Sequence, residues 1–239
     1  MLINLRNALM AGKKPPAPVG INYVECLNNT TCLCHTPNIA QQSAPFTISV
    51  WANISSSQPS LSEGRVICLT GTYGTATRGI DLGLTKSGSD FKIGAFIQYY
   101  DLGSKITYTP YLDAWHNIVI TQDNSSVYTY IDGVGQRTAR STSYTMQNVK
   151  LGLGCIQWFG NMLSGGPIGK YANLAYFGRR LSASEITNLA SDITHLPTDA
   201  DHCYDMVIAN GRIADIGTLG GWDFTTISDF QNGVYVPPQ

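Results

Sequence analysis

Charge of either sign is scarce in this chain. Its 239 residues include 15 Lys or Arg and 16 Asp or Glu, together 13% of the sequence, whereas soluble domains usually carry about 25%. A disordered polyelectrolyte is therefore excluded. The formal net charge of −1 provides no basic field that could hold a phosphate backbone, so we expect no nucleic acid among the partners.

Glutamate and long apolar runs are also lacking. Glutamate occurs only as Glu25, Glu63 and Glu185, while Gly (24) and Tyr (13) are abundant, a composition typical of a turn-rich all-β protein. No apolar run approaches the about 18 residues of a membrane-spanning helix, so we expect no membrane partner. Asn4 and Arg6 interrupt the opening stretch, where a secretory signal needs an unbroken apolar run. We therefore expect these first residues to be structural.

The six cysteines are too few for a disulfide-dense scaffold. Cys68 and Cys155 stand in apolar runs, where cysteine is usually a small buried hydrophobe. Three alternatives remain open for the others: a zinc site with neighbouring histidines, a disulfide joining Cys203 to the early cluster, or free thiols. That early cluster comprises Cys26, Cys32 and Cys34. Its spacing lacks the usual gap of about two to four residues between paired zinc ligands, so we expect no metal and no cofactor.

The first residues predict a short amphipathic helix followed by a stiff spacer. The apolar stripe at helical spacing consists of Leu2, Ile3, Leu5, Leu9 and Met10. Gly12 and the prolines of residues 15–18 end it. A helix of about ten residues is unstable alone in water, so it must dock either on its own domain or on a partner. Because the Pro-rich spacer separates it from the domain, we expect the stripe to anchor the chain to a partner.

Residues 21–177 alternate apolar and polar side chains in short runs between turn residues, the pattern of two packed antiparallel sheets. Phe46–Ile54 is the clearest strand. The other expected strands are Arg65–Leu69, Gly79–Leu84, Phe91–Tyr100, Lys105–Thr109, Trp115–Gln122, Ser126–Ile131, Gly135–Ala139, Val149–Leu153 and Gly169–Phe177. Asp132-Gly133 predicts a tight hairpin turn, since both central positions of that turn need positive φ.

One helix is expected after the last of these strands, over Ser182–Ala190. Ser182 and Glu185 form a capping box, in which the Ser182 hydroxyl accepts from the amide three residues on and Glu185 reaches back. Residues 192–239 mix Pro, Gly and short apolar runs, which either add a strand or wrap over the surface. We divide the chain into an anchoring helix and linker (1–20), a sandwich (21–205) and a C-terminal extension that packs on the sandwich (206–239).

Four motifs recur in a definite order along the chain. They are Phe46-Thr47-Ile48-Ser49-Val50-Trp51, then Trp115-His116-Asn117-Ile118, then Tyr130-Ile131-Asp132-Gly133, and last the strand Gly169–Phe177 followed by Leu181-Ser182-Ala183-Ser184-Glu185-Ile186. In type and order this series resembles the laminin G-like, concanavalin A-like jelly-roll family, over residues 40–192. The resemblance implies an all-β fold, a two-sheet antiparallel jelly-roll sandwich.

Two departures from the family bear on function. Ala172 and Asn173 stand where members usually carry acidic residues, so the resemblance implies no calcium site there. Retaining glucanases need two carboxyls about 5 Å apart, and the three glutamates are widely separated in sequence. The aspartates expected at strand ends or turns, where Asp is a turn former, are Asp81, Asp90, Asp101, Asp113, Asp123 and Asp132. We therefore expect no catalytic residues, and we expect that the protein is not an enzyme.

Residues 1–14 resemble the N-termini of structural proteins encoded by phages and prophages of gut Bacteroidota, in which such a leader precedes variable jelly-roll domains. This resemblance implies an attachment peptide with other virion proteins as partners. A virion protein leaves the cell by lysis and needs no export signal, which agrees with the character of the opening residues.

Aromatic rings are the candidate binding groups. Sugars are recognised by stacking on Trp or Tyr and by hydrogen bonds from Asn, Asp and Gln. The candidate rings are Tyr73, Tyr99, Tyr100, Trp158 and Trp222. The alternative for each ring is packing in the core or at a subunit contact, and its exposure decides between the two.

The two resemblances together imply a non-enzymatic phage virion protein, a fibre or decoration protein of the head or tail, in several copies such as a homotrimer. Its jelly roll would bind host or mucosal glycans weakly and multivalently, with avidity supplying the strength. The expected location is the virion. The alternative is a secreted or surface carbohydrate-binding protein of a gut bacterium. A glycan-cleaving enzyme is disfavoured by the shortage of glutamate.

Overall fold

The structure is a computed structural model. It describes residues 20–28, 33–38, 42–43, 45–59, 61, 63–73, 76–97, 100–139, 145–158 and 161–237. The anchoring stripe, which consists of Leu2, Ile3, Leu5, Leu9 and Met10, lies outside the described residues.

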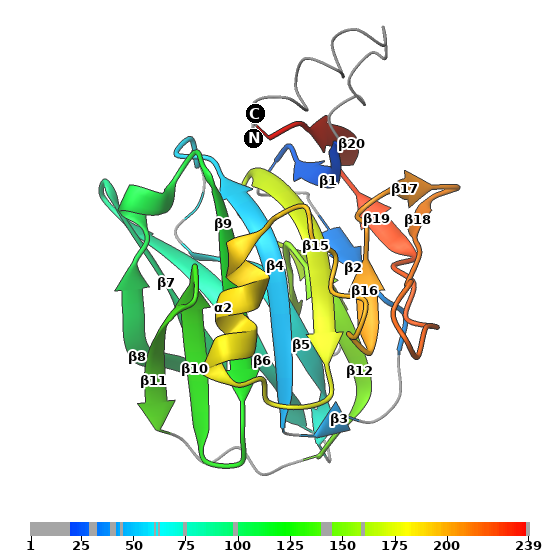
Figure 1. The fold of residues 1–239 in the computed structure, drawn as a ribbon. Helices are drawn as coiled ribbons and strands as arrows, with labels where there is room; N and C mark the ends of the chain where they lie inside the picture. The colour runs from blue at the N-terminus through cyan, green and yellow to red at the C-terminus, as the bar shows by residue number, and fades with distance from the viewer. Residues whose placement is uncertain are drawn as a thin grey trace, which may run out of the picture.

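Two large antiparallel sheets pack against each other as a jelly-roll sandwich (Figure 1), so the expected fold class is confirmed. The first, sheet A, has the order β11-β10-β9-β4-β15-β1-β20, and β16 pairs with β15. Its strands are β1 (Ile21–Cys26), β4 (Phe46–Ile54), β9 (Trp115–Gln122), β10 (Ser126–Ile131), β11 (Val134–Ala139), β15 (Gly169–Phe177), β16 (His202–Tyr204) and β20 (Phe230–Tyr235).

The second, sheet B, has the order β19-β2-β12-β5-β6-β7-β8, and β3 pairs with β12. Its strands are β2 (Leu33–His35), β3 (Gln42–Ser43), β5 (Glu63–Tyr73), β6 (Ala76–Ser87), β7 (Asp90–Ile97), β8 (Tyr100–Thr107), β12 (Thr145–Leu153) and β19 (Thr226–Ser228). The remaining elements are the hairpins β13 (Cys155–Trp158) with β14 (Asn161–Ser164) and β17 (Ile208–Ala209) with β18 (Arg212–Ile213), and the 3-10 turn η1 (Thr109–Tyr111).

With one exception, the expected strands are present, and several are longer than the alternating pattern indicated. β5 and β6 reach 11 and 12 residues, because their pairing continues past the apolar segments. The single strand expected over Phe91–Tyr100 is wrong: the chain turns there, and β7 pairs with β8 as a hairpin. Asp132 and Gly133 have φ values of 49° and 79°, which confirms the predicted tight turn.

Side chains from the inner faces of both sheets form one apolar core. Sheet A contributes Ile48, Val50 and Ile120, and sheet B contributes Leu69 and Leu82, all at most 1% exposed. Full burial of such a side chain contributes about 1.5–3 kcal/mol. Because side chains alternate along a strand, the residues between these core positions lie on the outer faces of the sandwich.

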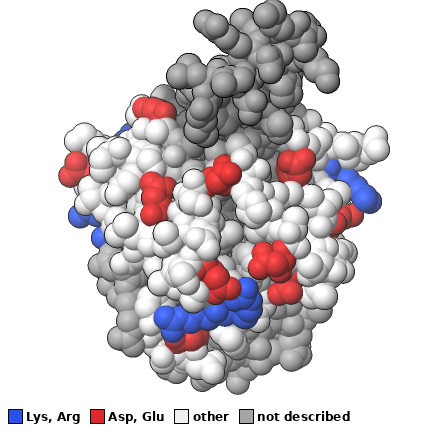
Figure 2. All heavy atoms as spheres, viewed as in Figure 1, with Lys and Arg blue, Asp and Glu red and all other residues white. Residues whose placement is uncertain are grey.

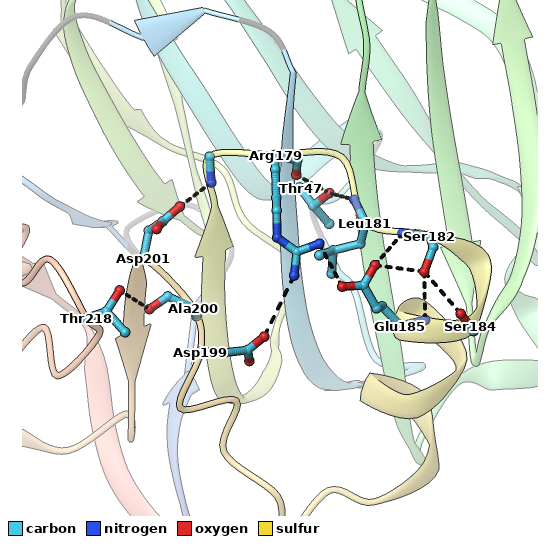
Figure 3. A network of polar contacts seen from close by, with 11 residues as sticks. Thr47, Arg179, Leu181, Ser182, Ser184, Glu185, Asp199, Ala200, Asp201 and Thr218 are labelled. Carbon is cyan, nitrogen blue, oxygen red and sulfur yellow. Dashed lines mark hydrogen bonds and ion pairs between the residues drawn. The ribbon is translucent and has the colours of Figure 1, made fainter.

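The helix α2 (Ala183–Ser191) lies on the outer face of sheet A (Figure 1). Ser182 Oγ accepts the backbone N–H of Glu185 at 3.3 Å, and Glu185 Oε2 accepts the backbone N–H of Ser182 at 2.8 Å, so the capping box is confirmed (Figure 3). The Glu185 carboxylate accepts hydrogen bonds from the backbone N–H and the hydroxyl of Ser182 and from Arg179, which lower its pKa to about 2. Thr47 of β4 accepts the backbone N–H of Leu181 at 3.1 Å, which fixes the start of the helix on the sheet.

The face that carries α2 is mostly uncharged, and its basic side chains gather beside acidic ones (Figure 2). Arg179 lies 2.7 Å from Glu185, and Arg180 lies 2.6 Å from Asp123. These exposed pairs contribute little to stability, but they leave no broad basic area among the described residues of this face.

The C-terminal residues are part of the sandwich. β20 pairs with β1 along its whole length, from Ile21 opposite Tyr235 to Cys26 opposite Phe230. Of the two alternatives for residues 192–239, a strand or a surface wrap, the structure has strands: β20 at the edge of sheet A, β16 beside β15, and β19 at the edge of sheet B.

A buried carboxylate holds residues 202–222 in place. Asp215 accepts hydrogen bonds from His202 Nδ1 at 2.6 Å and from the backbone N–H groups of Cys203, Gly217 and Trp222 at 3.0–3.1 Å. Burial alone would raise its pKa, but these hydrogen bonds hold the pKa of Asp215 below its ordinary value. The carboxylate is therefore charged at neutral pH and satisfies four donors.

Replacing Asp215 with alanine is expected to destabilise the protein by about 3 kcal/mol or more, since it leaves buried donors without an acceptor. Chemical denaturation measures the effect. The control is Asp199→Ala, whose side chain is 73% exposed and which should change stability by less than about 0.5 kcal/mol. Equal effects of the two substitutions would contradict the role given to Asp215.

Candidate functional site

The outer face of sheet B carries a cluster of charged and aromatic side chains. Ile80 and Leu82 of β6 belong to the core, so the alternation of the strand turns Asp81 outward. The register pairs Asp81 with Cys68 of β5 and with Phe96 of β7. Asp81 thus lies in the middle of β6, and the expectation that it occupies a strand end or a turn is wrong.

Arg65 of β5 joins the members of this cluster. Its Nε lies 3.3 Å from Asp81 Oδ2, and a terminal nitrogen lies 2.7 Å from Glu63 Oε1. The guanidinium carbon stands 4.0 Å from the centroid of the Phe96 ring. A Cβ at Gly83 would collide with that ring, so glycine at this position makes room for the stacked pair. Arg65, Asp81 and Phe96 are only 1–3% exposed.

Burial dominates the chemistry of Asp81. It raises the pKa of this carboxyl to about 6 in spite of the attraction of Arg65. Its second oxygen, Oδ1, is buried and has no hydrogen-bond partner. The unpaired oxygen and the raised pKa are linked. Removing a carboxylate from water disfavours its charged form unless every oxygen is paired.

The β13–β14 hairpin begins and ends on β5 beside Arg65. The Gly154 N–H donates to Val66 O at 3.1 Å, and the Arg65 N–H donates to Gly165 O at 3.3 Å. A Cβ at Gly166 would collide with the Gly154 backbone, so the two arms meet closely only because residue 166 is glycine. β13 consequently lies against β5, and Trp158 is carried to the tip of this hairpin.

The register places Tyr73 and Tyr100 at one end of sheet B. Tyr73 ends β5 at its turn into β6, and Tyr100 begins β8 opposite Ile97 of β7. Ile97 also pairs with Ile80 near the start of β6, so the two turns lie at the same end. Three strand spacings separate β5 from β8, about 14 Å. The side chains of Tyr73, Tyr100 and Trp158, and the whole of Tyr99, lie outside the described part of the structure.

Trp222 does not belong with these rings. It is 8% exposed, and its ring stacks on His202 with 3.6 Å between centroids and 11° between planes. Its backbone carbonyl accepts the hydroxyl of the buried Tyr204 at 3.0 Å. Trp222 is an interior residue that packs beside Asp215, so the expectation that it stacks on a sugar is wrong.

The cysteines divide into a bonded and an unbonded group. Cys26 is disulfide-bonded, to a cysteine outside the described side chains. Cys203 is a buried free thiol, and burial raises its pKa to about 12. Of the three alternatives left open, the disulfide between Cys203 and the early cluster is therefore excluded, and Cys203 is a free thiol. Among the described residues, no group of three or more His, Cys, Asp or Glu could hold a metal ion.

Asn173 has a conformational role at the position where the family usually carries an acid. Its φ of 48° lies in the left-handed region, and it occupies a bulge in the pairing of β15 with β4. Its side-chain amide donates to the carbonyl of Ile193 at 2.5 Å. Asn173 thus ties the segment after α2 to sheet A.

Sequence reasoning missed Arg65, Asp81 and Phe96 as a group. A signal was present in each strand, because a charge interrupts the apolar segments Gly64-Arg65-Val66-Ile67 and Ile80-Asp81-Leu82. A single charged residue inside an apolar strand needs a partner, but the pattern does not say which residue supplies it.

No helix in the described part of the chain is long and apolar enough to cross a membrane.

Residues 28–187, more than half of the chain, match the laminin G family described as the concanavalin A-like lectin/glucanases superfamily. No curated protein matches the chain. One similar solved structure is a Bacteroides ovatus protein that has been assigned a carbohydrate-binding role, with a TM-score of 0.57 and 12% identity over 92% of this chain and 62% of that one. Another is the heptameric SAP-like pentraxin of Limulus polyphemus, with a TM-score of 0.53 and 11% identity over 94% of this chain and 92% of that one. At these identities the likeness concerns the fold alone.

The titration of Asp81 should make the protein less stable as pH rises. Its pKa of about 6 in the folded state exceeds its ordinary value of 3.8, so the folded state binds this proton more tightly. The contribution of this proton to the free energy of unfolding is complete below about pH 4. It is lost as the pH rises to about 6.5, and the loss amounts to about 3 kcal/mol. Chemical denaturation across this range measures it. Asp81→Asn should lack this decline and Asp199→Asn should keep it, whereas identical profiles for wild type and Asp81→Asn would contradict the argument.

Proposed function

The chain belongs to the concanavalin A-like lectin/glucanases superfamily, and from this membership we propose that it binds glycans without cleaving them. The observation that carries the proposal is the register that brings Tyr73 and Tyr100 to one end of sheet B. Rings on separate strands at one sheet end can stack on successive units of an extended sugar chain. Tyr99 and Trp158 are the further rings proposed for this site.

The Arg65 cluster supports binding over hydrolysis. A glycosidase needs one protonated carboxyl and a second, ionised one on either side of the bond that it cleaves. Here one guanidinium binds both Glu63 and Asp81, and Asp81 is 3% exposed, so neither carboxylate stands free beside the other. Their contacts instead cross-link β5 and β6, which stiffens the sheet whose end carries the tyrosines.

The proposed setting is a phage particle, in which the protein is a fibre or decoration protein of the head or tail. The support is the resemblance of residues 1–14 to virion leaders and their apolar stripe. In this setting the leader attaches to other virion proteins, and several copies, for example a homotrimer, display their sandwiches to host or mucosal glycans. Many weak sites then act together through avidity.

The disulfide of Cys26 favours a second setting. Disulfides form and persist in oxidising compartments and are rare in the cytosol, where phage proteins assemble. A secreted or surface carbohydrate-binding protein of a gut bacterium would acquire this bond on export. Both settings keep the same binding domain and differ in how it is displayed.

Tyr100→Ala and Tyr73→Ala are each expected to weaken glycan binding about tenfold, since loss of a stacked ring costs about 1.4 kcal/mol, which corresponds to that factor. A glycan array with the full-length chain identifies the ligand, and titration of that oligosaccharide measures the loss. Tyr128→Ala, which removes a partly exposed ring from β10 of sheet A, is the control and should bind normally. Failure of the wild type to bind any glycan, or an equal loss in the control, would refute this site.

The protein is expected in stoichiometric amounts in phage particles purified from the source culture, as measured by mass spectrometry beside the host membrane and secreted fractions. Deletion of residues 1–14 should abolish incorporation and leave the thermal unfolding of the domain unchanged. Unchanged incorporation of the truncated chain would refute the anchor. Enrichment in the surface or secreted fraction would favour the second setting.

A further inference from the structure

A second cluster of rings lies on the other side of the sandwich, on the outer face of sheet A. Tyr23 of β1, Trp115 of β9 and Tyr235 of β20 come from the beginning, middle and end of the chain. The centroid of Trp115 stands 5.8 Å from that of Tyr23 and 5.6 Å from that of Tyr235. All three side chains are partly exposed. We name this the β1–β9–β20 ring cluster.

The ring cluster is supported from below. Its floor consists of Ile21, Trp51 and Ala172, which are 6%, 9% and 0% exposed. Trp51 of β4 and the small Ala172 of β15 lie between β9 and β1, and the side chains of Trp115 and Tyr23 meet over these two strands. The inner sides of the rings are thus packed, and what remains of their surface reaches solvent.

Gly233 determines where Tyr23 lies. A Cβ at Gly233 would collide with the far end of the Tyr23 ring, so this ring lies across the bare backbone of β20. Gly233 has no positive φ, so the backbone there does not require glycine. Its absent side chain serves to position one ring.

Polar groups surround the rings in one row across the sheet. The register runs from Trp115 to Asn53, Lys170, Glu25 and Gln231, on five neighbouring strands. The amide of Gln231 donates to Glu25 Oε2 at 3.4 Å. This row supplies donors and acceptors, and the charges of its one lysine and one glutamate cancel.

Lys170 also approaches the rings themselves, with its ammonium group 5.3 Å from the centroid of Tyr23. An ammonium group so close to a ring adds a directional donor beside an apolar surface. Rings bordered by hydrogen-bonding side chains of both kinds are the combination that recognises a sugar. The core of a protein–protein interface, in contrast, is depleted in Lys and Glu.

We infer that the β1–β9–β20 ring cluster is a second carbohydrate-binding site, and that it takes an uncharged sugar. The balanced charge of the row gives no preference for an acidic or a basic ligand. The site shares no residue with the end of sheet B and lies on the outer face of sheet A, so it goes beyond the function proposed above. One chain could then bridge two glycans.

The test uses the full-length chain on immobilised neutral oligosaccharides, namely cello-, xylo-, manno- and galacto-oligosaccharides and neutral mucin O-glycans. Gly233→Ala displaces the Tyr23 ring without removing any buried side chain. It should weaken binding to at least one of these probes about tenfold while the unfolding midpoint stays within about 2 °C of wild type. Tyr235→Ser is a second variant with the same expected loss, and Tyr235→Phe, which keeps the ring, should bind normally.

Tyr100→Ala separates this inference from the sheet B site. Retention by Tyr100→Ala of a probe that Gly233→Ala and Tyr235→Ser lose supports the inference, even if no glycan depends on Tyr100. Wild-type binding of every probe by both sheet A variants overturns the inference and leaves the sheet B site standing. Loss of the same probes in all three variants also overturns it, because one site would then account for the binding. Binding of no neutral probe by the wild type overturns it as well.

Discussion

The structure depends on covering two apolar sheet faces with each other. Ile48 and Val50 of β4 meet Leu69 and Leu82 of sheet B in one core. Because successive side chains of a strand point to opposite faces, the neighbours of these inward-facing residues must point outward. Arg65 and the other members of its cluster must then stand on the outer face of sheet B, and the β1–β9–β20 rings on the outer face of sheet A. The positions of both clusters are therefore consequences of core packing.

Local signals account for what the sequence could predict. The Ser182–Glu185 capping box and the Asp132-Gly133 turn each involve residues within one helical turn or one hairpin, and both are present. The strands were recognisable because alternation is also a local property. Pairing between distant strands is not local, since β1 and β20 are joined only by contacts across more than two hundred residues of sequence. The ring cluster that they complete could not be read from spacing.

The mistaken expectations share a physical reason. Trp222 was a candidate for exposure, and a disulfide of Cys203 was one of three open alternatives, because nothing near these residues in sequence shows how they are buried. Asp215 decides both positions, since its single carboxylate accepts the backbone N–H groups of Cys203 and Trp222. A turn-forming residue type thus acts here as an interior acceptor. The sequence shows that an aspartate is present at position 215, but only the folded structure shows which groups donate hydrogen bonds to it.

Asp81 is also a buried carboxyl, but its pKa is shifted in the opposite direction from that of Asp215. Asp215 has four donors and a lowered pKa, whereas Asp81 has one bonded oxygen, one bare oxygen and a raised pKa. Hydrogen bonds in low dielectric favour the charged carboxylate, and burial without them disfavours it. Arg65 divides its guanidinium between Asp81 and the more exposed Glu63, so it cannot satisfy Asp81 fully. One guanidinium thus cross-links β5 and β6 through two carboxylates, and it leaves one buried oxygen of Asp81 without a hydrogen-bond partner.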